Sequence, residues 1–252
     1  MPSVSPKNSF SDRVIEFVNR VSYRRAETQD DLNAIRHLRY AAYLKEGAID
    51  QREDEQLVDE FDDLGKVANI GLYCDDHLIG ALRIHFLENP FDVSPATHSF
   101  PEILGPYLAV GKRIVDPSRL VADYKFSRAF PELPYAALRV SVMASEFHRA
   151  DFAVATLRAE HQAAYKRAFF ATPLCPPREY PLLSKKIGLM LVNYKVDRER
   201  ILSRGPYFDS THEERQILFA RTPYEKFDSK KIKSTRLSNA AEFGDVAYSQ
   251  AS

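Results

Sequence analysis

The sequence lacks several features on which common classes of site depend. Its 252 residues include no tryptophan, nine glycines and only two cysteines, Cys74 and Cys175. Two such distant cysteines form neither a disulfide framework nor a metal site of usual spacing, so we expect no metal site and a reducing compartment. A G-x-S-x-G nucleophile elbow, an H-E-x-x-H zinc motif, a P-loop and a dinucleotide fingerprint are all absent from the sequence.

Net charge is lacking as well. Lysine plus arginine and aspartate plus glutamate both number 35, so the overall positive charge of nucleic-acid-binding domains is missing. No stretch approaches the roughly 20 apolar residues of a membrane span, and Asp12, Arg13 and Glu16 lie where a secretory signal needs an apolar run. We expect a soluble cytoplasmic protein without a nucleic-acid partner or transmembrane segment, and leave transient contact with a membrane surface open.

What is present alternates between strand-like and helix-like segments. Apolar and β-branched runs predict strands at 21–26, 70–73, 78–86, 152–157 and 187–194. Capping signals and helical periodicity predict helices at 28–47, 102–108, 135–148, 160–170 and 196–202. This alternation predicts one α/β domain over residues 21–225, preceded by a polar segment at 1–20 and followed by a disordered tail at 226–252.

The stretch Ile114–Asp123 reads as a disturbed strand. Its flanks are β-formers, but Pro117 has no N–H and therefore belongs at an edge or a bulge. A bulge leaves backbone N–H groups unpaired, with Asp116, Ser118 and Arg119 as the nearest polar side chains. A capped turn between two short strands is the alternative interpretation.

A second polar group gathers around the acidic segment Asp50–Leu64. A solvated loop is the simpler interpretation of its charges. However, Arg83 lies inside the predicted strand at 78–86 among apolar residues, where it either faces solvent or meets the acidic loop across the sheet. His161, at a strand-to-helix junction, is interpreted as a structural histidine rather than a catalytic one.

The order of these elements resembles the GNAT N-acyltransferase fold, a central mixed sheet with a bulged strand, flanked by helices. Asp151–Phe169 is similar to the end of that core, which implies that Tyr165 acts as general acid toward a leaving thiolate; simple packing is the alternative. Members that use coenzyme A have a glycine-rich turn after the bulged strand to hold the pyrophosphate. Residues 123–134 contain no glycine. The resemblance therefore implies no bound cofactor, and the acyl-phosphopantetheine of an acyl carrier protein as co-substrate.

Within that fold the chain resembles the bacterial acyl-homoserine-lactone (autoinducer) synthases and, more closely, the long-chain N-acyl amino acid synthases. The shared positions are a helix arginine with an aromatic residue four positions later, an acidic pair, a strand arginine and an E-x-S-R element. In this chain they are Arg39, Tyr43, Asp59, Asp62, Arg83, Asp116, Ser118 and Arg119. The runs RAEHQAAYKRAFF, PLCPPREYP and IGLMLVNY extend the resemblance over 23–219. Asp116 replaces the family's glutamate, and Ile49 stands where the lactone synthases have tryptophan.

The resemblance implies an enzyme that moves a long-chain fatty acyl group from acyl carrier protein to the amine of an amino acid. Asp116 is the first candidate for the proton acceptor and Glu160 the second. Backbone N–H groups at 117–119, with Ser118 and Arg119, would hold the oxyanion. Arg83 and Arg119 would fix the acidic loop beside the amino-acid pocket, together with Arg39 and Tyr43.

Two further expectations concern the donor. Apolar residues are predicted to line the acyl chain, unless they are core: Phe86, Phe100, Leu104, Tyr107 and Leu108. Basic residues are predicted to receive the acidic carrier protein, unless they are ordinary solvated charges: Lys166, Arg167, Lys185 and Lys186. Two other functions remain open, a lactone synthase that takes S-adenosylmethionine and a non-catalytic homologue that binds acyl carrier protein or lipid.

Overall fold

The computed structural model describes residues 9–180, 183–220 and 232–233. The α-helices are α1 (Phe10–Val18), α2 (Gln29–Lys45), α3 (Pro95–Ser99), α4 (Pro101–Ala109), α5 (Tyr124–Ala129), α6 (Leu133–His148), α7 (Gln162–Phe169), α8 (Tyr194–Arg204) and α9 (His212–Phe219). The strands are β1 (Val21–Arg25), β2 (Val67–Cys74), β3 (His77–Leu87), β4 (Ile114–Ala122), β5 (Phe152–Leu157), β6 (Thr172–Pro173), β7 (Arg178–Tyr180), β8 (Leu183–Val192) and β9 (Ile232–Lys233). Short 3₁₀ helices occupy Ala159–His161 and Pro206–Phe208.

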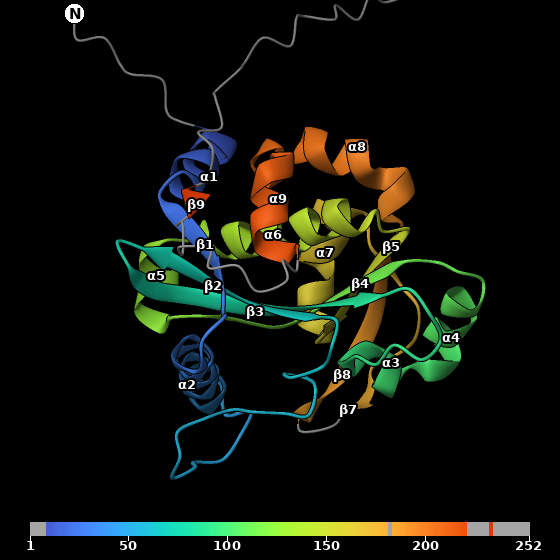
Figure 1. The fold of residues 1–252 in the computed structure, drawn as a ribbon, viewed down its shortest axis with the longest axis horizontal. Helices are drawn as coiled ribbons and strands as arrows, with labels where there is room; N and C mark the ends of the chain where they lie inside the picture. Colours follow the sequence, from blue (N-terminus) through green and yellow to red (C-terminus); the bar gives the residue numbers. More distant parts are fainter. Residues whose placement is uncertain (1–8, 181–182, 221–231, 234–252) are drawn as a thin grey trace, which may run out of the picture.

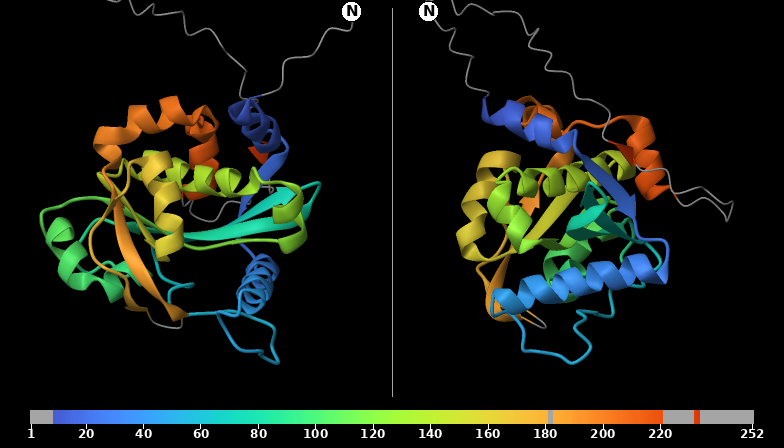
Figure 2. Two further views of the ribbon diagram at one scale, coloured as in Figure 1. Left: turned by 180° about the vertical axis from the view of Figure 1, so that it is seen from behind. Right: turned by 90° about the vertical axis from the view of Figure 1, so that its left-hand side faces the viewer.

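The strands form one mixed sheet flanked by helices, as the sequence predicts. Their order is β6-β8-β5-β4-β3-β2-β1-β9, with β7 paired to β8. The β4–β5 pair is parallel and the other pairs are antiparallel. Helix α2 lies on one face of the sheet, whereas α1, α6, α8 and α9 lie on the other (Figures 1 and 2).

Three local predictions differ from the structure. The segment predicted to be polar at 1–20 contains α1, because Val14, Ile15, Phe17 and Val18 form a buried face behind a Ser9–Asp12 capping box. The loop predicted at 123–134 contains α5, which Asp123 caps. Helices α3 and α9 were not predicted. Of the tail predicted to be disordered, residues 232–233 pair with β1 and the rest lies outside the described residues.

Strand β4 carries the bulge that its sequence predicts. In the register with β3, Ala81 lies opposite Val121 and Arg83 opposite Ser118, so β4 contains one residue more than β3 over this interval. Arg119 absorbs the irregularity with φ of 52°, a left-handed conformation that is uncommon for a residue with a side chain. The strand continues on both sides, so the stretch is a bulged strand and not a turn between two strands.

Strands β4 and β5 separate soon after they meet. Their pairing is limited to Ile114 with Phe152 and Val115 with Ala153. Beyond Val115 the edge of β4 that faces β5 has no strand partner. This parting of two parallel strands opens the middle of the sheet.

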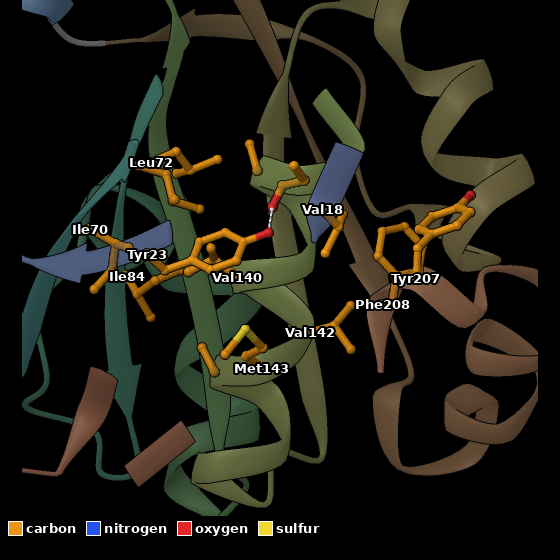
Figure 3. Packing of buried hydrophobic residues seen from close by; sticks show 14 of the residues in the cluster. Val18, Tyr23, Ile70, Leu72, Ile84, Val140, Val142, Met143, Tyr207 and Phe208 are labelled. Carbon is orange, nitrogen blue, oxygen red and sulfur yellow. Dashed lines mark hydrogen bonds between the residues drawn. The ribbon is translucent and has the colours of Figure 1, made fainter. Parts of the chain in front are cut away.

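The main core lies between the sheet and α6. Tyr23, Ile70 and Ile84 from the strands pack against Val140 and Met143 of the helix (Figure 3). The Tyr23 hydroxyl donates to the carbonyl of Ala136, 3.1 Å away. Each fully buried aliphatic side chain of this size contributes about 1.5–3 kcal/mol, so this layer fixes α6 on the sheet.

A buried ion pair ties the end of the described chain to this core. Arg139 of α6 is fully buried and donates to the Asp209 carbonyl at 2.7 Å and to the Glu214 carboxylate at 3.1 Å. Glu214 lies in the first turn of α9, which begins at His212, and closes a capping box with Thr211. Helix α9 is therefore held to α6 by charge as well as by packing.

Replacing Glu214 with alanine is expected to lower the free energy of unfolding by about 3–5 kcal/mol, because Arg139 keeps its charge in the core without a counter-charge. Urea denaturation followed by circular dichroism measures the change. Glu213→Ala, at an exposed position in the same helical turn, is the control and is expected to cost less than about 1 kcal/mol. Equal losses in the two variants would show that the pair is not what holds α9.

Candidate active site

A buried ionic network joins α2, the acidic loop, β3 and the bulge. Asp62 accepts hydrogen bonds from Arg39 at 2.6 Å and from Arg83 at 2.9 Å. Asp59 binds Arg83 and also accepts two hydrogen bonds from Arg119, at 2.9 and 2.6 Å. Three guanidinium groups therefore share two carboxylates, with exposed fractions of 0–9% for all five side chains.

Neutral partners complete the network. The Asn69 side-chain oxygen accepts from Arg39 at 2.6 Å, and the Ser118 hydroxyl accepts from Arg83 at 3.1 Å. The guanidinium of Arg119 lies 5.3 Å from the centre of the Tyr43 ring. The acidic segment is thus folded onto the sheet, and Arg83 meets it there rather than facing solvent.

The charges explain which members of the network are able to exchange protons. Burial opposes ionisation of Asp59, but Arg83 and Arg119 hold its pKa well below the usual range. Burial also opposes the charge of Arg119, yet Tyr43 and Asp59 raise its pKa above that of a free guanidinium. Both groups therefore stay ionised at neutral pH and are unsuited to taking a proton from an amine.

A cavity of about 1820 Å³ passes through the gap between β4 and β5. On the face covered by α2 it is lined by polar groups that include Tyr43, Asp59, Arg83 and Arg119. On the face covered by α6 its wall is mainly apolar: Leu138, Val142, Ala153, Ala155, Leu157, Ala168, Phe169 and Val192. The cavity therefore has one charged wall and one apolar wall, which meet at the bulge.

Helix α7 supplies Tyr165 to this cavity. Burial raises the pKa of its hydroxyl to about 12, so the group stays protonated. The structure thus brings Tyr165 into the same space as Ser118 and Arg119. Glu160, in contrast, is exposed, does not line the cavity and pairs with Arg158 at 3.2 Å.

Asp116 lies next to the cavity and not in its lining. It is fully buried, and its Oδ2 accepts the Ala96 N–H at 3.0 Å, at the start of α3. Its Oδ1, and Nδ1 of the facing His85, have no hydrogen-bond partner among the described residues. Burial raises the pKa of Asp116 to about 6.

The residues predicted to line the acyl chain lie in the core. Phe86 packs against Phe147, His148 and Phe219. Leu104 belongs to a second cluster of buried residues, with Phe100, Leu108, Ile114 and Leu189 among its members. Neither side chain is among those that line the cavity.

Among the cavity-lining residues that were not identified as site residues from the sequence are His98, Tyr124 and Arg158. His98 belongs to α3, and its ring packs edge-on against Phe61 at 5.6 Å. The proline-rich insertion around it carried no helix signal strong enough to place it.

No group of His, Cys, Asp and Glu that suits a metal ion occurs among the described residues. No described helix is long and apolar enough to cross a membrane.

A mixed sheet flanked by helices, with a bulge in β4 and a cavity where β4 and β5 part, is the architecture of the GNAT-like acyltransferase fold. The family model of the N-acyl amino acid synthase FeeM matches residues 34–193, more than half of the chain. The chain therefore belongs to the FeeM family of N-acyl amino acid synthases, which are N-acyltransferases. A search of curated protein sequences finds no match.

Solved structures share the fold at low sequence identity. The structure of FeeM, an N-acyl amino acid synthase from uncultured soil microbes, is 15% identical with a TM-score of 0.61, over 73% of this chain and 96% of that one. The acyl-homoserine-lactone synthase LasI is 17% identical with a TM-score of 0.54, over 82% and 98%. TofI, in complex with an inhibitor and MTA, is 12% identical with a TM-score of 0.55, over 75% and 100%.

Asp59→Asn is expected to destabilise the protein by about 3–5 kcal/mol at pH 7, because Arg83 and Arg119 lose the charge that they share. The folded-state pKa of Asp59 is lowered, so the wild-type advantage is full above about pH 4, the unfolded value, and shrinks as pH falls below it. Urea denaturation at several pH values measures this. Asp63→Asn, in the same loop with 76% of its side chain exposed, is the control; a similar loss there would contradict the role of the network.

Proposed function

We propose that the protein transfers a long-chain fatty acyl group from the pantetheine thioester of an acyl carrier protein to the α-amine of an amino acid. The amine nitrogen attacks the thioester carbon, a C–N bond forms and the C–S bond breaks. The amine loses one proton and the leaving thiolate gains one. The single observation that carries this proposal is the cavity through the parted strands, with its charged and apolar walls.

The apolar wall is proposed to hold the acyl chain. Leu138 and Val142 of α6 face this part of the cavity, together with Ala168 and Phe169 of α7. In this assignment Phe86 and Leu104 support the wall from the core and do not touch the chain. The carbonyl of the thioester would then lie beside the bulge, where the two walls meet.

The bulge is proposed to stabilise the oxyanion. Arg119 and Leu120 have no register partner on β3, and beyond Val115 the other edge of β4 has no partner on β5. Backbone N–H groups along this irregular edge are proposed to donate to the developing negative charge, and loss of one such donor costs about 10²–10³ in rate. Tyr165, which stays protonated, is proposed to donate to the leaving thiolate.

The acidic loop is proposed to close the amino-acid side of the site. Its network holds one more cation than anions in the set of Arg39, Arg83, Arg119, Asp59 and Asp62. The excess positive charge favours an acceptor that carries a carboxylate. Since Asp59 and Asp62 are committed to arginines, the proton of the amine must go elsewhere.

Asp116 is the proposed proton acceptor, acting through a water molecule. Its pKa of about 6 suits a base that works near neutral pH, and its Oδ1 is free among the described residues. Glu160 is the second candidate, but it lies exposed beside Arg158. Asp116 is therefore the first residue to test.

The start of the two helices after β4 supports a carrier-bound donor rather than coenzyme A. Asp123 caps α5, and its Oδ1 accepts from the N–H groups of Lys125 at 2.9 Å and Phe126 at 3.0 Å. Helix α6 begins after Glu132 and has Pro134, which lacks an N–H, in its first turn. The chain's own carboxylate thus occupies the start of α5, where a pyrophosphate would otherwise bind, whereas Glu132 makes no capping hydrogen bond at α6 and accepts from Arg13 instead. A pantetheine arm on a carrier protein has no pyrophosphate.

The proposal is tested by incubating the enzyme with long-chain acyl carrier protein or the matching acyl-coenzyme A, and a panel of amino acids, followed by mass spectrometry. The expected products are N-acyl amino acids formed from the carrier-bound donor. Acylation from acetyl-coenzyme A alone would contradict the proposal. Tight binding of the carrier protein without turnover on any amine would show a non-catalytic homologue, and a lactone formed from S-adenosylmethionine would show a lactone synthase.

Asp116→Asn is expected to lower kcat/KM by about 10²–10⁴ and to abolish its rise through about pH 6, because the base becomes active only when ionised. Rate profiles between pH 5 and 8 measure this. The raised pKa means that ionisation of Asp116 costs stability as pH rises from about 4 through 6, so the variant is expected to be at least as stable as wild type at pH 8. Glu160→Gln is the control, and full activity of Asp116→Asn would remove Asp116 from this role.

A further inference from the structure

Arg158 is held differently from Arg83 and Arg119, the two cavity arginines of the ionic network. Arg158 follows β5 and lines the cavity at the end of the gap, where β4 and β5 have parted. Its Nη2 lies 3.4 Å from a carboxylate oxygen of Glu46, at the end of α2, and 3.2 Å from Nε2 of the exposed His161. Its Nε lies 3.2 Å from Glu160. The Arg158–Glu46 pair therefore joins two separate elements that both line or border the same opening.

The partners of Arg158 are weak ones. Glu46 and Glu160 are 62% and 58% exposed, and ion pairs of this kind contribute about 0–1 kcal/mol. Arg83 and Arg119, in contrast, share buried carboxylates in the network and are unable to leave them without stranding a charge. Among these three arginines of the cavity, Arg158 is the one whose guanidinium is able to exchange its partners for a ligand.

A second cation lies at the same opening. Lys45, also in the cavity lining, places its Nζ 3.7 Å from the centre of the Tyr124 ring. Arg128 lies over the same ring at 5.7 Å. Tyr124 is 47% exposed, so these cations border a solvent-accessible entrance and not a sealed pocket.

We propose that Arg158, with Lys45, binds the phosphodiester of the donor's pantetheine arm, and that Glu46 holds Arg158 at the entrance until a donor arrives. This inference rests on the proposed pantetheine-bound donor. The planar fork of a guanidinium matches two oxygens of a phosphate, which a single carboxylate oxygen at 3.4 Å does not. The thioester end of the arm then extends along the unpaired edge of β4 toward the bulge.

The roles of the two opposite charges differ. Arg158 contributes binding energy for the phosphate, whereas Glu46 competes with the phosphate for the same guanidinium. Removing Arg158 is therefore expected to weaken binding of the donor, and removing the charge of Glu46 is expected to strengthen binding. A purely structural ion pair would instead make the two substitutions act in the same direction.

The test compares two soluble donors that differ only in the phosphate, acyl-phosphopantetheine and acyl-pantetheine, by calorimetric titration. Arg158→Gln is expected to raise the Kd of the phosphate-bearing donor about tenfold or more and to leave that of the phosphate-free donor unchanged within about twofold. Glu46→Gln is expected to lower the Kd of the phosphate-bearing donor alone. Arg24→Gln is the control, because Arg24 is similarly exposed at 28%, pairs with the exposed Asp76 and does not line the cavity.

The inference would be overturned if Arg158→Gln raised the Kd of both donors equally. It would also be overturned if the variant raised only the KM of acceptors that carry a carboxylate and not the KM of their amides. The second result would assign Arg158 to the amino acid. Because binding is measured without turnover, phosphate-dependent binding with no amide product would uphold this site while contradicting the proposed acyl transfer. Amide formation with equal Kd values for the two donors would support the proposed acyl transfer and contradict the phosphate site.

Discussion

Three buried guanidinium groups share two carboxylates in this protein, and the arrangement of the site depends on that sharing. Arg83 alone contacts Asp59, Asp62 and Ser118, so it connects the acidic loop to both β3 and β4. Burying these charges costs several kcal/mol per ion before the pairs compensate for it. Such a network is therefore a source of unique geometry more than of net stability. It makes one wall of the cavity rigid and leaves its charges unable to shuttle protons.

The bulge depends on the same network. Arg119 adopts φ of 52°, which is unfavourable for a residue with a side chain, and its guanidinium is held by Asp59 on one side and Tyr43 on the other. The extra residue of β4 lies at Arg119 and Leu120 in the register with β3, beyond Val115, where the pairing of β4 with β5 ends. The ionic network thus holds the side chain of Arg119 in place at the irregularity of β4.

The sequence predicts the elements far better than it predicts their contacts. Pro117 indicated an edge or a bulge and left a capped turn open; the structure has the irregularity at Arg119 and Leu120, while Pro117 itself pairs with Ile84. The position of Arg83 among apolar strand residues left two alternatives, a solvated face or the acidic loop, and the family resemblance favoured the loop. The positions of Asp116 and Leu104 relative to the cavity were harder to predict. The face of a strand or helix that borders the cavity depends on how β4 and β5 part, which is a long-range property of the fold. His98 and Arg158 gave no local signal at all. Their positions in the cavity wall follow only from the way the fold brings α3 and the end of β5 to the same cavity.

The chain's own acids occupy the places where anions would bind, and this shapes which donor the site is able to take. Asp123 satisfies the first N–H groups of α5, Glu132 precedes α6, and Glu46 engages Arg158. The first two positions carry N–H groups or a helix dipole and favour a pyrophosphate when no carboxylate is present. Glu46 differs from them because it is exposed and holds its arginine by one long contact. In the proposed function, the carboxylate at the start of α5 disfavours a pyrophosphate, while Arg158 and Lys45 remain for a single phosphodiester. We propose that selectivity between the two kinds of thioester donor follows from where the chain places its own carboxylates, without any glycine-rich loop.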